Sequence, residues 1–177
     1  YQKEVVEHKS LRENLIDQLN DLNLTRDEFL ISEAIISSLD DSGELVEGLD
    51  EIENLLDFRY SYKEIEKVLT DIIHLLDPAG IGFRSLKETI YIQLKRKNID
   101  NQLLHISEII LFKSSGMNIL DMKNKLLNDY DEASVENSIK LIKECDLAPG
   151  LSCSDDQYVV PDLIVMENSS KNLVNFI

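Results

Sequence analysis

The spacing of apolar residues is helical along almost the whole chain, and this periodicity constrains the fold more than any other feature. A hydroxyl residue followed three positions later by Glu, the capping box that begins a helix, precedes four apolar stretches: Ser10…Glu13, Thr25…Glu28, Ser61…Glu64 and Ser85…Glu88. In the stretch after Ser61 the apolar residues fall on one helix face, which comprises Ile65, Val68, Leu69, Ile72, Ile73 and Leu76. The pattern predicts an all-α fold.

We expect eight helices, separated by short polar breaks. Their ranges, with each end placed to about 2–4 residues, are 10–22, 26–39, 50–57, 62–76, 86–97, 102–114, 118–129 and 133–145. Two stronger breaks interrupt the series. The first contains Asp77, Pro78, Gly80 and Gly82, where the proline ends a helix and the glycines permit positive φ. We interpret these four residues as a structural turn.

The second strong break, Asp146-Leu147-Ala148-Pro149-Gly150, is similar to the first, and helical periodicity stops after it. Residues 157–165 are rich in β-branched side chains, but Pro161 is incompatible with a central strand. The sequence therefore predicts two small helical bundles in tandem, at residues 1–77 and 78–148. An extended or short β-ribbon tail, ordered in part, is expected at residues 149–177 as a linker.

The chain is strongly acidic, with 34 Asp and Glu against 18 Lys and Arg, which gives a formal net charge of −16. Nucleic acids and anionic membranes attract basic surfaces, so this charge argues against both as direct partners of the fragment. Between Arg26 and Arg59 there are 11 acidic residues and no Lys or Arg. Two interpretations stay open for that stretch: a solvated helical face, or a surface that meets a basic partner.

Patterns for metal, cofactor or catalytic chemistry are lacking, and we predict no catalytic, cofactor-binding or metal-binding residue and no enzymatic activity. With Gly43 at the sixth position of a calcium loop, the twelfth is Leu49 instead of the required Glu. The histidines are distant in sequence from one another and from both cysteines, which rules out zinc spacing. His74 lies opposite the apolar stripe of its helix, and we expect it to face solvent.

Cysteine usage and hydropathy bear on location. Cys145 and Cys153 are read as reduced thiols, because no secretion signal precedes them. No apolar run approaches the roughly 20 residues of a membrane span. We therefore expect a cytoplasmic protein, and a chain that begins with Tyr1 is expected to be a piece of a longer one.

Four motifs in order resemble the core-binding region of the sigma-54 (sigma-N) RNA polymerase sigma factors. They are Ser-Leu-Arg-Glu-Asn-Leu-Ile-Asp-Gln-Leu at 10–19, Ile-Ile-Ser-Ser-Leu-Asp-Asp-Ser-Gly-Glu-Leu at 35–45, Leu-Asp-Pro-Ala-Gly-Ile-Gly-Phe-Arg-Ser-Leu-Lys-Glu at 76–88, and Tyr-Val-Val-Pro-Asp-Leu at 158–163. The sequence departs from the family pattern at Glu44, Phe83 and Leu147-Ala148.

The resemblance implies a non-enzymatic role in transcription initiation, with core RNA polymerase as the partner. Promoter DNA of the −24/−12 type would be read only by regions absent from this fragment, under an ATP-hydrolysing activator that acts indirectly. The expected polymerase contacts are Leu39, Asp40, Asp41, Gly43, Leu45 and Arg84. For Arg84 the alternative is a lock between the bundles. The alternative for the whole chain is an acidic helical adaptor that binds another basic protein.

Overall fold

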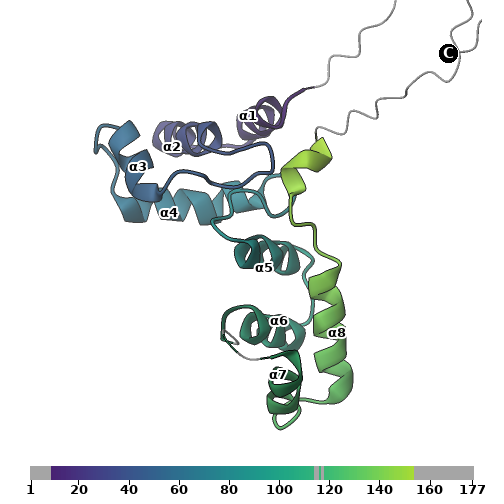
Figure 1. Cartoon of the computed structure of the whole chain (residues 1–177). Helices are drawn as coiled ribbons and strands as arrows, with labels where there is room; N and C mark the ends of the chain where they lie inside the picture. The colour runs from purple at the N-terminus through teal and green to yellow at the C-terminus, as the bar shows by residue number, and fades with distance from the viewer. Residues whose placement is uncertain (1–8, 114–115, 117, 154–177) are drawn as a thin grey trace, which may run out of the picture.

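The computed structural model describes residues 9–113, 116 and 118–153, and this part of the chain is helical, without a β-sheet. The all-α prediction is therefore confirmed for these residues. The eight α-helices (Figure 1) are α1 (Leu11–Asp21), α2 (Arg26–Ser37), α3 (Leu49–Leu55), α4 (Tyr62–Asp71), α5 (Leu86–Arg96), α6 (Asn101–Glu108), α7 (Ile119–Leu126) and α8 (Glu132–Lys143).

The four predicted helix starts are all present, but one is capped differently from the expectation. At Ser10 and Thr25 the hydroxyl and the Glu three positions later cap each other's backbone N–H groups reciprocally. At α5 the Ser85 hydroxyl accepts the Glu88 N–H at 3.4 Å, whereas the Glu88 carboxylate binds the N–H and guanidinium of Arg84. The Arg84 guanidinium competes for that carboxylate because it carries a full positive charge and donates through two N–H groups, whereas the N-cap backbone offers one uncharged N–H.

Two predicted helices end earlier than expected. The α-helical part of α4 stops at Asp71, and a 3₁₀ helix, Ile73–Leu75, continues the chain. The tighter turn keeps Ile73 and Leu76 in the core, so the predicted apolar stripe is buried in spite of the change. Similarly, α6 ends at Glu108 and passes into a π-helix, Ile109–Lys113.

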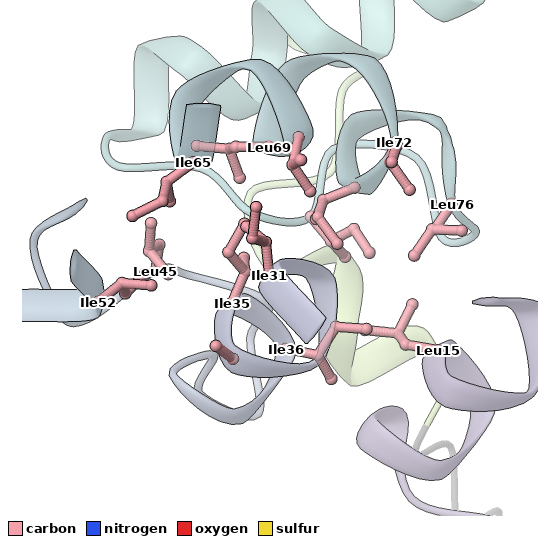
Figure 2. Packing of buried hydrophobic residues seen from close by; sticks show 14 of the residues in the cluster. Leu15, Ile31, Ile35, Ile36, Leu45, Ile52, Ile65, Leu69, Ile72 and Leu76 are labelled. Atoms are coloured by element: carbon pink, nitrogen blue, oxygen red, sulfur yellow. The ribbon is translucent and has the colours of Figure 1, made fainter. Parts of the chain in front are cut away.

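The larger hydrophobic cluster joins α1–α4 (Figure 2), and its side chains point from the four helices toward a common centre. Ile35, Ile52, Ile65 and Leu69 are fully enclosed there. Ile81, from the turn that follows the 3₁₀ helix, is buried in the same cluster. Burial of an aliphatic side chain of this size contributes about 1.5–3 kcal/mol, so this cluster is the principal source of stability for the described chain.

A smaller cluster joins α6, α7 and α8. Its buried members are Ile106, Met122, Leu126 and Val135. Helix α5 lies between the two groups (Figure 1), and it contacts both α6 and α8. The described chain therefore has two centres of apolar packing, one at either side of α5.

The described start of the predicted tail is helical and lies against α1. Pro149–Cys153 form a 3₁₀ helix that contacts α1, where we expected an extended segment. The expectation failed because the sequence pattern did not show the docking surface that receives Gly150. The predicted β-ribbon over residues 157–165 lies outside the described residues.

Candidate functional site

Three glycine-bearing segments that are distant in the sequence meet at the loop formed by residues 39–45. The Gly82 N–H donates to the Gly43 carbonyl oxygen at 2.8 Å, and the Gly150 N–H donates to the Ser42 carbonyl oxygen at 2.9 Å. The Leu45 N–H donates to the carbonyl oxygen of Phe83 at 2.8 Å. The two breaks predicted from the sequence are therefore both hydrogen bonded to one loop.

Glycine is required at this junction because the backbones approach so closely. A methyl group on Gly150 would lie 2.5 Å from the Asp41 carbonyl oxygen and 2.7 Å from the Gly43 nitrogen. A methyl group on Gly43 would lie 2.9 Å from Cγ2 of Ile81, and Gly43 also has φ of +87°. Both side chains would displace packed atoms, and Gly43 would in addition adopt a conformation that L-residues avoid.

Asp40 shapes the loop from inside. Its Oδ1 accepts the Ser42 N–H at 3.0 Å, the Ser42 hydroxyl at 2.7 Å and the Glu44 N–H at 2.8 Å. Desolvation of this carboxylate raises its pKa, but the hydrogen bonds from Ser42 and Glu44 outweigh desolvation, and the pKa of Asp40 lies below its usual value. Asp40 is therefore a structural residue as well as an exposed acid.

The structure separates the expected contact residues of this loop into two groups. Leu45 is 5% exposed, Gly43 is buried and Leu39 is half-buried against the first cluster. Asp40 and Asp41 are exposed. Of these five expected contact residues, only the two acids are exposed to solvent, and the others are packed wholly or partly within the fold.

The predicted structural turn is formed, with φ of +104° at Gly80 and +73° at Gly82, and its Asp77–Pro78 peptide bond is cis. Sequence reasoning missed the group that anchors the turn. The side-chain amide of Gln18 on α1 donates to the Asp77 carbonyl oxygen at 2.6 Å and accepts the Asp77 N–H at 2.8 Å. The position of Gln18 at the half-buried edge of an amphipathic helix was the sequence signal that could have indicated this anchoring role.

Arg84 connects two helices. Its guanidinium lies 2.6 Å from the Glu88 carboxylate on α5 and 3.4 Å from the Glu66 carboxylate on α4. Desolvation raises the pKa of Glu88, but the hydrogen bonds and charge of Arg84 outweigh it, and the pKa lies below its usual value. One guanidinium therefore links α4 to α5.

His74 does not face solvent, contrary to the prediction. Its ring is half-buried, and Nε2 lies 3.3 Å from the Gly82 carbonyl oxygen. The Gly82 carbonyl oxygen belongs to the turn that follows the 3₁₀ helix, and this tertiary contact, which helical spacing does not show, explains the error. Burial lowers the pKa of His74.

Within the part of the chain that the structure describes, no three His, Cys, Asp or Glu side chains are grouped to hold a metal ion. None of the helices found there is both long enough and apolar enough to span a membrane. What the described residues do present is a rigid acidic loop on a helical scaffold. This arrangement defines an all-α scaffold that exposes acidic side chains.

Residues 1–176 match the sequence model of the family described as "Sigma-54 factor, core binding domain". The chain therefore belongs to this family. An RNA polymerase sigma-54 factor of Shewanella violacea is 32% identical, with 94% of this chain and 35% of the relative covered. The Bacillus subtilis factor is also 32% identical, over 89% of this chain and 36% of the relative. A putative sigma-54 factor of Clostridium kluyveri is 39% identical over 58% of this chain and 22% of the relative. The chain thus spans about a third of the length of the Shewanella violacea and Bacillus subtilis factors.

Proposed function

We propose that this chain docks a sigma-54 factor on core RNA polymerase. The observation that carries the proposal is the family match over residues 1–176. The exposed carboxylates of the 39–45 loop and of α3 support it, because an acidic surface complements a basic one and speeds encounter. The role is adhesive and non-enzymatic, and it places the chain in the cytoplasm with the polymerase.

The complete protein would carry out the further steps of initiation. We propose that regions outside this chain read −24/−12 promoters and that an ATP-hydrolysing activator controls the complex. The chain covers only about a third of the length of the Shewanella violacea factor. Within this scheme the described helices hold the factor on the enzyme and leave promoter recognition to those other regions.

We also propose that the two apolar clusters mark two bundles in tandem, at residues 1–77 and 78–148, followed by a linker at 149–177. Separate buried centres on α1–α4 and on α6–α8 support this division. Ile81 packs in the first cluster although it follows residue 77, so the connecting turn rests on the first bundle. Arg84 would then fix how the second bundle begins.

The contact surface that we propose is the acidic part of the first bundle, at residues 40–53. Two of its acids are unsuitable for a clean test, because Asp40 holds its own loop and Glu51 accepts the Gly48 N–H at the start of α3. Asp41 and Asp50 are exposed and lie on different elements of the same surface. Asp50 lies in the first turn of α3, where Lys opposes the helix dipole by about 0.3–1 kcal/mol, so the thermal unfolding midpoint of the variant is measured beside its binding.

The test measures the affinity of the chain for purified core RNA polymerase at several salt concentrations. We expect Asp41→Lys with Asp50→Lys to weaken binding, most strongly at low salt, and to reduce the salt dependence. The matched control is Asp129→Lys with Glu144→Lys, an equal charge change at exposed positions outside residues 40–53, one after α7 and one at the end of α8. Equal binding by both double variants would refute the acidic contact surface, and no binding by the unmodified chain would refute the docking function. An adaptor for another basic protein is the less favoured candidate, because the family match offers no support for it.

A further inference from the structure

The turn between α3 and α4 displays large apolar side chains to solvent. Phe58 is 70% exposed, Leu55 is 60% exposed and Tyr62 is 43% exposed. These three residues lie within eight positions of one another in the chain. In Figure 1, α3 and this turn occupy the end of the molecule that is farthest from α6–α8. Leu55, Phe58 and Tyr62 belong to neither cluster of buried residues, so packing within the described chain does not account for these three apolar side chains.

The conformation of Phe58 gives no local reason for an aromatic residue. Asp57 and Phe58 have φ of +55° and +53°, in the left-handed region that bulky side chains avoid. Glycine or asparagine would adopt this conformation at lower cost. Since core packing and backbone geometry do not favour phenylalanine here, the exposed ring calls for an explanation outside the isolated chain.

The turn is also held rigidly, which is what an interface anchor needs. Leu56 and Tyr60, on either side of Phe58, pack against the first cluster. The Tyr60 hydroxyl donates to Oδ1 of Asp27 on α2 at 2.7 Å. The Phe58 N–H donates to the Glu53 carbonyl oxygen at 3.0 Å. An exposed side chain on a fixed backbone loses little conformational entropy when it binds.

The composition and charge around the turn indicate the chemistry of the partner. Aromatic residues and arginine are enriched at the centre of protein interfaces, and Arg59 adds an exposed guanidinium beside Phe58. On the other side, α3 carries the exposed acids Asp50 and Glu51, which continue the proposed acidic contact surface. Arg59 is the first base after the 11 acids that follow Arg26.

We propose that Leu55, Phe58 and Tyr62 form the apolar centre of the contact with core RNA polymerase. Phe58 inserts into an apolar pocket of the polymerase, and the side of that pocket toward α3 carries Lys or Arg residues. This inference rests on the proposed function and extends its acidic surface by an apolar anchor. The carboxylates then steer the encounter, and the ring supplies most of the lasting affinity.

The test compares Phe58→Asn and Phe58→Tyr with the unmodified chain in binding to purified core polymerase. Asparagine tolerates positive φ and removes the ring, so Phe58→Asn is expected to retain the thermal unfolding midpoint or raise it. We expect this variant to bind about tenfold or more weakly, the effect of losing a central anchor. The slope of affinity against salt is unchanged, because no charge is removed. Phe58→Tyr keeps the ring but adds a hydroxyl that the apolar pocket would have to desolvate, so we expect its affinity to lie between those of the unmodified chain and Phe58→Asn.

Leu127→Asn is the matched control, since Leu127 is an exposed apolar residue near the second cluster. It is expected to bind normally. If the unmodified chain binds and Phe58→Asn binds equally well, or if Leu127→Asn weakens binding as much, the anchor is refuted while polymerase docking stands. If the unmodified chain does not bind core polymerase, the docking function and the anchor fail together.

Discussion

The side chain of Gln93 pairs with the backbone of Asp146 through two hydrogen bonds, at 2.6 Å to the carbonyl oxygen and 2.9 Å from the N–H. Gln18 makes the same pair with Asp77. Each aspartate opens one of the two breaks in the helical sequence, after α8 and after the 3₁₀ helix that follows α4. A glutamine on an earlier helix therefore fixes the point at which the chain leaves each group of helices.

The Gln93 pair is the more deeply buried, and its removal should cost more. Gln93 is 7% exposed, whereas Gln18 is half-buried. Gln93→Ala leaves the backbone groups of Asp146 without their partner and is expected to lower the free energy of unfolding by about 2–3 kcal/mol. Gln18→Ala should cost about 1 kcal/mol. Urea denaturation of both variants measures the difference, and equal losses would contradict this ranking.

Replacement of Gly82 by Ala is predicted to lower the stability of the fold more than the same replacement at Gly116, which also has positive φ. A methyl group on Gly82 would lie 2.9 Å from Cγ2 of Ile73, whereas one on Gly116 would meet no atom of the described residues within 4 Å. Both have positive φ, so each Ala variant loses about 1 kcal/mol from backbone strain. Gly82→Ala should lose at least about 1 kcal/mol more from overpacking. Thermal unfolding checks the comparison, and an equal loss in both would contradict it.

Gly150→Ala is predicted to release the 3₁₀ helix Pro149–Cys153 from the 39–45 loop. Its methyl group would overlap backbone atoms of Asp41 and Ser42, which no side-chain rearrangement relieves. In the unmodified chain the N–H at position 150 donates to the Ser42 carbonyl oxygen. In the variant we expect faster amide exchange at this position, whereas the amide of Leu69 in the first cluster stays protected. Hydrogen exchange read by NMR tests this. Unchanged protection at Gly150 would show that the loop can accommodate the methyl group.

Acidification from pH 7 to 5 is predicted to destabilise the fold through His74. Burial lowers the pKa of His74 in the folded chain below its ordinary value of about 6.5. Its contribution is fully present above the unfolded pKa and is lost as the pH falls from there toward the folded pKa, because the unfolded state binds the proton first. His74→Gln should flatten the dependence of unfolding free energy on pH in this window. His105→Gln, at an exposed position, is the control, and the same flattening there would contradict the assignment.

The sequence by itself determined the helices, because their signals are local. Capping residues and a 3.6-residue apolar period act within a few positions, and the stripe from Ile65 to Leu76 is buried as its spacing predicts. The positive φ of Gly80 and Gly82 is also a local consequence of the turn that follows Pro78. The family motifs depend on the same local residues, and the comparison over residues 1–176 agrees with them.

Only the tertiary structure decided which motif residues hold the fold and which face a partner. Gly43 and Gly150 are 107 positions apart, and their backbones meet because two chain segments dock, which no local pattern encodes. The expected contacts Leu45 and Asp41 are neighbours in sequence, but packing buries the leucine and leaves the acid exposed. Phe58 shows the reverse: its side chain is apolar, but the left-handed turn between α3 and α4 leaves it exposed to solvent.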